Sequence, residues 1–160
     1  MNNETSAKSL SIEQWCELAD SGIDVPVTIQ LSGYSMQPLI RYKKDYVTIV
    51  PLRRSLMISD IVVFRLHDGR YCCHRVSKLE NGRVQTFGDN TTKPDPWMTP
   101  DRIIGLVTEM ERNGRKYNLD CRAARAYGKL HMALFPLRKL KRNIIQFLWK
   151  YYVKFFKKGR

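Results

Sequence analysis

The side chains that could do chemistry in this sequence are one serine, one histidine and two aspartates, in that order along the chain. Ser35 stands in the segment Gly33-Tyr34-Ser35-Met36-Gln37-Pro38, between two apolar stretches. A glycine and a proline around a single hydroxyl favour a sharp turn that presents the serine at the end of a strand. A serine hydroxyl is a weak nucleophile and needs a neighbouring base to take its proton. Taken alone, the segment is equally consistent with a simple turn in which Met36 fills the core.

His74 is the candidate base, in His74-Arg75-Val76 on a predicted strand. The other two histidines, His67 and His131, lie at a hairpin end and in the C-terminal extension. A single histidine on a strand is more often structural than catalytic. Two carboxylates follow it, those of Asp89 and Asp95. Since a carboxylate that holds the imidazole tautomer completes a serine triad, these side chains together predict acyl transfer through a serine nucleophile.

The elements that must position these side chains are mainly β-strands. Stretches rich in β-branched residues are separated by the dipeptides Asp68-Gly69, Asn81-Gly82 and Asn113-Gly114. Such dipeptides between apolar runs are typical of hairpins, so we expect a mainly antiparallel β domain. The expected strands cover residues 25–31, 46–52, 60–65, 70–80, 83–87, 103–111 and 116–119.

Helices are expected on both sides of this domain. Residues 1–23 form an N-terminal segment with one short helix, whose apolar residues fall on one face and would cover part of the core. Residues 121–160 form a C-terminal extension that favours helix and that Pro136 divides into two pieces. The β domain is expected to occupy residues 24–120.

Five short motifs occur in the order found in signal peptidases and LexA-type self-cleaving repressors, and the sequence resembles this S24/S26 superfamily of serine peptidases. Residues 33–38 are similar to the nucleophile box, and residues 74–76 are similar to the general-base box. The other three motifs are Asp60-Ile61-Val62-Val63-Phe64, with Ser59 where the family usually has glycine, Gly88-Asp89-Asn90, and Ile103-Ile104-Gly105-Leu106-Val107. One such motif alone is a weak signal, whereas five in order are specific.

The resemblance implies a LexA/signal-peptidase-like antiparallel β fold and a serine endopeptidase that cleaves a leader, signal or precursor peptide. It implies Ser35 as the nucleophile and His74 as the base, as in the endoplasmic-reticulum and archaeal-type signal peptidases. Asp95 would be the acidic partner of the base, and Asp89 would hold its loop or share that role. Activity should then rise through roughly pH 6–7 as the imidazole loses its proton, whereas a lysine base would move the rise above about pH 9.

Two departures from the family pattern affect these expectations. Signal peptidases usually carry a serine two positions before the nucleophile that helps to stabilise the oxyanion, and here that position is Gly33. The oxyanion hole is therefore expected from the backbone N–H groups of Gly33, Tyr34 and, chiefly, Ser35. We also expect neither the N-terminal membrane anchor of signal peptidases nor the helix-turn-helix of LexA-type repressors.

No cofactor and no metal are expected. Cys72 and Cys73 are adjacent to His74, but no pair of the four cysteines has the spacing C-x-x-C. We expect the cysteines to be small apolar residues.

The whole net charge of +13 lies in the last third of the chain. Residues 1–110 contain 13 Lys/Arg and 13 Asp/Glu, whereas residues 111–160 contain 15 Lys/Arg and 2 Asp/Glu. A nucleic-acid-binding regulator would depend on this charge alone, and the neutral domain that holds the motifs argues against it. A non-catalytic peptide-binding relative would keep the fold and fail to react with serine-directed probes.

The second piece of the extension has the pattern of a basic amphipathic helix at a membrane surface. A polar stripe at helical spacing runs between aromatic and aliphatic residues that include Trp149; its members are Asn143, Gln146, Lys150, Lys154 and Lys157. Cations favour an anionic leaflet, so we expect a peripheral protein on the cytoplasmic face of a membrane, with a cytoplasmic protein as the alternative. The helix could instead pack on the β domain. Deleting residues 137–160 is expected to leave the active site formed.

Overall fold

The computed structural model describes residues 12–21, 25–66 and 68–156 of the 160-residue chain, so His67 and Lys157 lie outside the described residues. Helices α1, α2 and α3 span Ile12–Asp20, Arg122–Ala133 and Phe135–Phe156. The strands are β1 (Val27–Gln30), β2 (Tyr46–Pro51), β3 (Ile61–Arg65), β4 (Tyr71–Glu80), β5 (Arg83–Phe87), β6 (Ile103–Arg112) and β7 (Arg115–Asn118). A short 3-10 helix, Pro100–Arg102, precedes β6.

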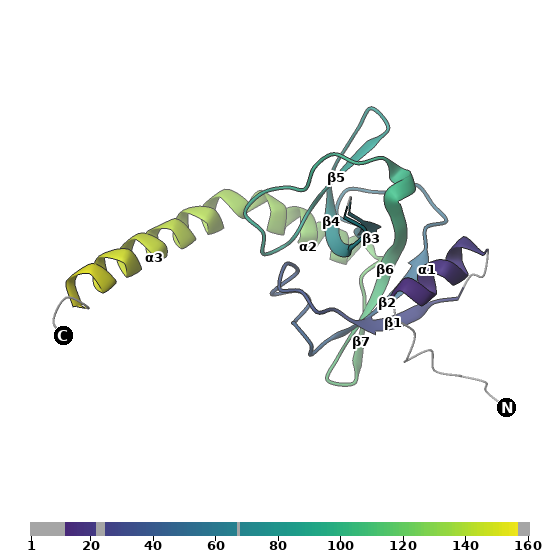
Figure 1. Cartoon of the computed structure of the whole chain (residues 1–160), viewed down its shortest axis with the longest axis horizontal. Helices are drawn as coiled ribbons and strands as arrows, with labels where there is room; N and C mark the ends of the chain where they lie inside the picture. Colours follow the sequence, from purple (N-terminus) through teal and green to yellow (C-terminus); the bar gives the residue numbers. More distant parts are fainter. Residues whose placement is uncertain (1–11, 22–24, 67, 157–160) are drawn as a thin grey trace.

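The seven described strands form one antiparallel sheet in the order β1-β2-β6-β3-β4-β5, with β7 paired to β6 (Figure 1). The prediction of a mainly antiparallel β domain is confirmed, and each predicted strand ends within two residues of the observed one. Asn81 and Gly82 both have positive φ angles, of 50° and 68°. The two-residue turn between β4 and β5 therefore has the backbone that an Asn-Gly pair supports.

The central strand β3 is buried on both faces and separates two apolar clusters. Ile61 and Val63 pack in one cluster, whereas Val62 and Phe64 pack in the other. Successive side chains of a strand point to opposite faces, so a strand between two cores reads as a continuous apolar run. This explains why the sequence from residue 61 to residue 64 does not alternate with polar residues.

Helix α1 docks on the sheet through Trp15, whose side chain is fully buried. A Cβ atom at Gly105 of β6 would lie only 2.6 Å from the Trp15 ring, so the missing side chain makes room for it. The indole N–H donates to the carbonyl of Val25 at 2.7 Å. The N-terminal helix therefore covers part of the core, as predicted.

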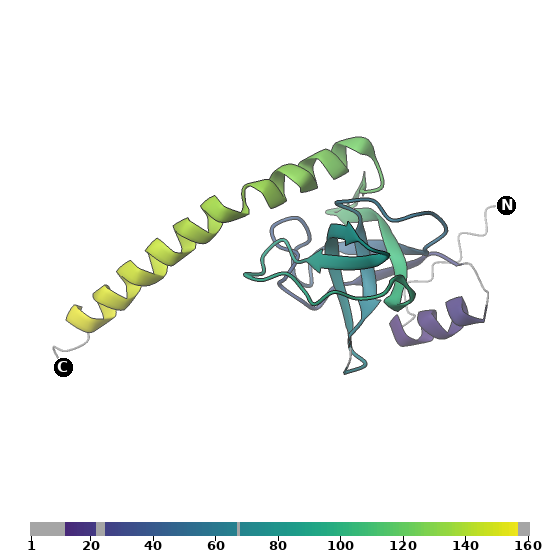
Figure 2. The same ribbon diagram turned by 90° about the horizontal axis from the view of Figure 1, so that it is seen from above.

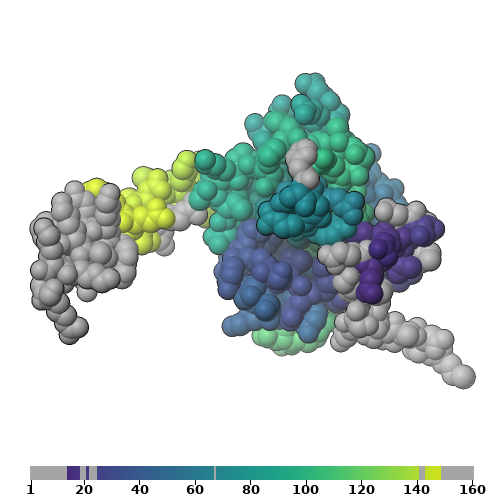
Figure 3. All heavy atoms as spheres, in the orientation of Figure 1, coloured from purple at the N-terminus to yellow at the C-terminus, as the bar shows by residue number. Residues whose placement is uncertain are grey.

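The two C-terminal helices have different surroundings. Helix α2 lies along the β domain, whereas α3 continues away from it after a bend at Leu134 (Figures 1 and 2). In the space-filling view, the yellow residues of α3 project from the body of the molecule next to residues coloured teal to green (Figure 3). None of the described helices is both long enough and apolar enough to cross a bilayer.

Candidate active site

Ser35 lies in a turn that buried side chains anchor to the core. Met36 and Ile40 are almost fully buried, and Ile40 N–H donates to the Met36 carbonyl at 2.9 Å. Ser35 itself is half-buried, and the preceding Tyr34 is 58% exposed. The turn therefore holds the serine at the surface, above side chains that are firmly packed in the core.

His74 is carried by β4, opposite Val62 of β3, and is only 5% exposed. The Phe64 ring lies beside it, with centroids 5.9 Å apart. The Cys72 sulfur lies 3.6 Å from Nδ1 and 3.4 Å from Nε2. These nearly equal distances place the sulfur over a face of the imidazole ring. It therefore does not lie in the lone-pair direction of either nitrogen. The imidazole is thus packed on its faces, with its edges left for polar partners.

Asp95 holds one edge of the imidazole. Its Oδ2 lies 2.6 Å from His74 Nδ1 and accepts a second hydrogen bond from the Thr86 hydroxyl, also at 2.6 Å. The backbone N–H of Asp95 donates to the Thr86 carbonyl at 2.9 Å, and Gln85 Nε2 donates to the Asp95 carbonyl. Since Nδ1 is engaged by the carboxylate, Nε2 is the nitrogen left for proton transfer.

The pKa of His74 is raised to about 9. Burial of the ring acts in the opposite direction and would lower the pKa, but the hydrogen bond to Asp95 and the neighbouring Cys72 outweigh it. The expectation of an activity rise through pH 6–7 took an unperturbed imidazole, and this environment moves the expected rise to a higher pH. The rise should lie near pH 9, so its position alone does not distinguish this histidine from a lysine base.

Gly88 brings the base and the nucleophile turn together. A Cβ atom at this position would lie 2.9 Å from His74 Nε2 and 2.9 Å from the Ser35 carbonyl oxygen, so these two atoms are separated by less than twice that distance. Asn90, two residues after Gly88, fixes the turn, because its N–H donates to the Ser35 carbonyl at 2.7 Å. No described residue hydrogen-bonds to the Ser35 hydroxyl, and such bonds commonly tighten only when substrate binds.

The backbone of the turn leaves N–H groups available. Among the described residues, none accepts a hydrogen bond from the N–H of Gly33, Tyr34 or Ser35. The Tyr34 carbonyl, in contrast, accepts bonds from Gln37 N–H and Asn90 Nδ2, both at 3.2 Å. The turn therefore has its carbonyl oxygens engaged and keeps donors that could stabilise an oxyanion.

Asp89 does not contact His74. It forms a bidentate salt bridge with Arg75, whose Nε and Nη2 donate to the two carboxylate oxygens of Asp89 at 2.9 and 2.8 Å. Both side chains are buried, and Arg75 Nη1 also donates to the carbonyl and hydroxyl oxygens of Ser59. Of the two roles considered for Asp89, holding the loop is the one that its contacts fit.

Ser59 and Asp60 are structural parts of their motif. Ser59 has a φ angle of 82°, a backbone conformation that favours glycine. The Asp60 carboxylate accepts hydrogen bonds from Nη1 and Nη2 of Arg54, at 2.7 and 3.0 Å, and from Met57 N–H. The motif therefore fixes the entry into β3.

Some residues of the site were not predicted from the sequence. Thr86 carries the only hydroxyl of β5 and is fully buried. A hydroxyl residue two positions before Gly88, on the strand that leads into this motif, was the sequence signal that could have marked it. His131 and Arg138 reach the Asp89 carbonyl from the C-terminal helices, at 3.1 and 3.0 Å, and no motif marks them.

Arg138 changes the expectation for a truncated chain. Because it contacts the loop that holds the Ser35 carbonyl, deleting residues 137–160 would remove a contact of the candidate site. Farther along α3, the backbone of Trp149, Lys150 and Lys154 is helical, but their side chains lie outside the described part of the structure.

Comparison with protein-family models gives no match to this chain, and none of the curated proteins matches it either. Function is therefore inferred from the residues of the site.

Proposed function

We propose that the chain is a serine endopeptidase of the signal peptidase and LexA-like superfamily, with a LexA-like β fold, that cleaves a leader, signal or precursor peptide. The observation that carries the proposal is the 2.6 Å contact between His74 Nδ1 and Asp95 Oδ2, with Nε2 beside the Ser35 turn. A buried imidazole held by a carboxylate next to a serine is the arrangement that activates a hydroxyl.

In the proposed reaction, the Ser35 hydroxyl attacks the carbonyl carbon of a peptide bond while His74 Nε2 takes its proton. Asp95 stabilises the imidazolium that forms and keeps Nδ1 protonated. The imidazolium then returns the proton to the leaving amine, and an acyl-enzyme remains on Ser35. Water, deprotonated by His74, hydrolyses this ester and releases the second product. The free N–H of Ser35, with those of Gly33 and Tyr34, would donate to the oxyanion.

Helix α3 is proposed to bind the surface of an anionic membrane, on its cytoplasmic face. Its sequence holds six Lys/Arg and no Asp/Glu. Its described apolar side chains are more than half exposed at Leu137, Leu140, Ile145, Phe147 and Leu148. A helix with exposed apolar and cationic side chains fits the interface between anionic headgroups and acyl chains. The helix would place the enzyme, and the substrate would be a peptide presented near that surface.

Serine-directed labelling tests the peptidase. The chain should react with a fluorophosphonate at Ser35, located by mass spectrometry, and cleave members of a peptide library between pH 7 and about 10. Ser35→Ala should abolish both without unfolding the protein. Ser32→Ala is the matched control, because Ser32 is an exposed serine of the same loop. His74→Ala should reduce both as strongly as Ser35→Ala, since the members of a triad act as a unit.

The alternative is a peptide-binding relative without catalysis. It is supported by one observation, the absence of a described hydrogen-bond partner for the Ser35 hydroxyl. A folded wild-type chain that is neither labelled nor able to cleave any library peptide would decide for this alternative.

A further inference from the structure

The peptide group between Asp89 and Asn90 links the C-terminal helices to the candidate nucleophile. Its N–H donates to the Ser35 carbonyl at 2.7 Å. Its carbonyl accepts a hydrogen bond from Arg138 Nη1 of α3 at 3.0 Å and lies 3.1 Å from His131 Nε2 of α2. One backbone amide is therefore held on both sides, by the nucleophile turn on one and by a cation on the other.

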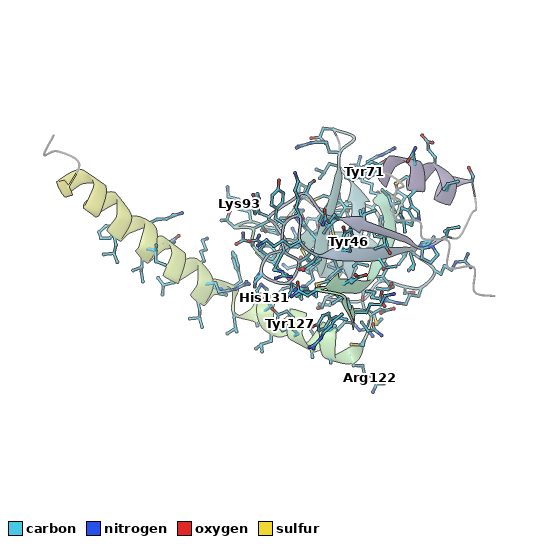
Figure 4. The ribbon with its side chains drawn as sticks, turned by 90° about the horizontal axis from the view of Figure 1, so that it is seen from below. Tyr46, Tyr71, Lys93, Arg122, Tyr127 and His131 are labelled. Atoms are coloured by element: carbon cyan, nitrogen blue, oxygen red, sulfur yellow. The ribbon has the colours of Figure 1, made fainter. Side chains whose placement is uncertain are left out.

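Several contacts hold Arg138 in this position. Its Nη2 donates to the His131 carbonyl at 2.6 Å, and its Nη1 also contacts the His131 ring. Phe135, at the start of α3, packs edge to face against Phe87 of β5, with centroids 4.8 Å apart. In Figure 4, His131 lies between α2 and the β domain. The first turn of α3 is thus docked at the loop 88–91, although the rest of the helix leaves the domain.

A cation on the carbonyl of an amide polarises it and strengthens the hydrogen bond that its N–H donates. The bond that gains here is the one from Asn90 to the Ser35 carbonyl. The same loop contains Gly88, whose missing side chain permits the approach of His74 to Ser35. The distance between base and nucleophile therefore depends on where this loop lies.

We infer that Arg138 is a positioning residue for the proposed peptidase: through the amide of Asp89 and Asn90 it holds the Ser35 turn against His74. His131 supports it from α2. The inference depends on the proposed function for its catalytic consequence. The hydrogen bond of Arg138 to the Asp89 carbonyl, called the clamp below, can be observed without catalysis. It makes the start of α3 part of the active-site structure and leaves the later part for surface binding.

The experiment compares Arg138→Met with Lys139→Met in the full-length chain. Both changes remove one cation from α3 and keep good helix formers, but Lys139 is exposed. Hydrogen exchange at the Asn90 amide should become about tenfold faster or more in Arg138→Met, the loss of one charge-assisted hydrogen bond, and stay unchanged in Lys139→Met. Arg138→Lys should recover part of the protection, because an ammonium can still donate to the Asp89 carbonyl.

Cleavage of a library peptide supplies the second measurement. Arg138→Met should lower kcat by about tenfold or more with little change in KM, since the clamp orients the nucleophile and does not bind substrate. Unchanged exchange at Asn90 in a folded Arg138→Met would overturn the inference. If exchange accelerates but the wild type shows no cleavage and no serine labelling, the clamp stands and the proposed peptidase fails.

Discussion

His74 and Arg75 are neighbours on β4, and their side chains serve different partners. His74 contacts Asp95 in the loop after β5, where Thr86 supports the carboxylate. Arg75 points the other way and is only 1% exposed, bound to Asp89 and Ser59. Adjacent residues of a strand face opposite sides of the sheet, so one dipeptide supplies both the candidate base and the ion pair that fixes the loop beside it.

Replacing Asp95 should change the pH dependence of catalysis. In Asp95→Asn the hydrogen bond from the carboxylate that raises the pKa of His74 is lost, and only Cys72 still opposes burial, so the activity rise should move from near pH 9 to a lower pH. The maximal kcat should fall by as much as about 10⁴-fold, because an amide no longer enforces the productive tautomer. The measurement is kcat/KM from pH 5 to 10. Asp101→Asn, at an exposed aspartate, is the control.

The free energy of unfolding should also depend on pH through the contact between His74 and Asp95. The pKa of His74 is higher in the folded state than the usual 6.5, so the ion pair stabilises the fold fully below pH 6.5. That contribution is lost as the pH rises through 9. The difference in unfolding free energy between wild type and Asp95→Asn should therefore shrink from pH 6.5 to pH 9 in denaturant titrations. A constant difference, or an unmoved pH-rate profile, would contradict the assignment of Asp95.

Replacing Asp89 should act on folding. Asp89→Asn leaves the buried Arg75 guanidinium without its carboxylate, and breaking a buried ion pair from one side costs about 3–5 kcal/mol. We expect a large fall in the midpoint of urea unfolding, with loss of activity as a consequence. Asp68→Asn, which breaks an exposed ion pair with Arg70, should leave the midpoint of urea unfolding close to that of the wild type. If Asp89→Asn were as stable as the wild type but inactive, the aspartate would have a chemical role instead.

At the scale of elements, α2 is docked on the domain by a glycine. Gly128 is the buried residue of this helix, and a side chain there would collide with the Ser59 hydroxyl and the Arg75 guanidinium. Arg125 adds an ion pair with Asp120 at 2.6 Å. The helix therefore covers the buried Arg75 and shields its ion pair from water.

Gly128→Ala should destabilise the protein, although alanine is the better helix former. In an exposed helix this change would stabilise by about 1 kcal/mol. Here the methyl group must displace Ser59 or Arg75, and overpacking of this kind costs about 1–3 kcal/mol. Thermal and urea unfolding measure it. Lys129→Ala, one position along and exposed, should lie within about 0.5 kcal/mol of the wild type. A Gly128→Ala protein more stable than the wild type would show that α2 does not pack as described.

The strands were predictable from the sequence because their signals are local. Hairpin dipeptides and β-branched runs are fixed by backbone and side-chain sterics within a few residues. The contact of His74 with Asp95 followed only from the resemblance, since residues 21 positions apart meet through strand pairing. The clamp of Arg138 on the Asp89 carbonyl could not be predicted, because it depends on the direction in which α3 leaves α2. Nothing in an exposed-looking basic stretch distinguishes that arginine from its neighbours.

At the scale of the whole molecule, residues 1–110 carry no net charge, whereas the helix α3 that projects from the β domain is cationic (Figures 1 and 2). The first turn of α3 is docked at the loop 88–91, and a hollow of about 280 Å³ between them reaches to Gln146. Beyond this hollow, the ribbon of α3 leads away from the β domain. Deleting the chain beyond Gln146 would therefore separate the proposed membrane-binding part of α3 from the candidate active site.

Deleting residues 147–160 should release the protein from anionic vesicles and leave the peptidase working. The cut removes five of the Lys/Arg residues and most of the aromatic ones of the extension, and it keeps Arg138 and the hollow intact. Binding of the full chain should weaken between low and moderate salt, because exposed cations are screened over about 8–10 Å. Sedimentation with vesicles of phosphatidylserine and phosphatidylcholine, and serine labelling in solution, are measured on both chains. A shortened chain that still sediments, or full-length binding that ignores salt and lipid charge, would mean that α3 does not attach the enzyme to an anionic surface.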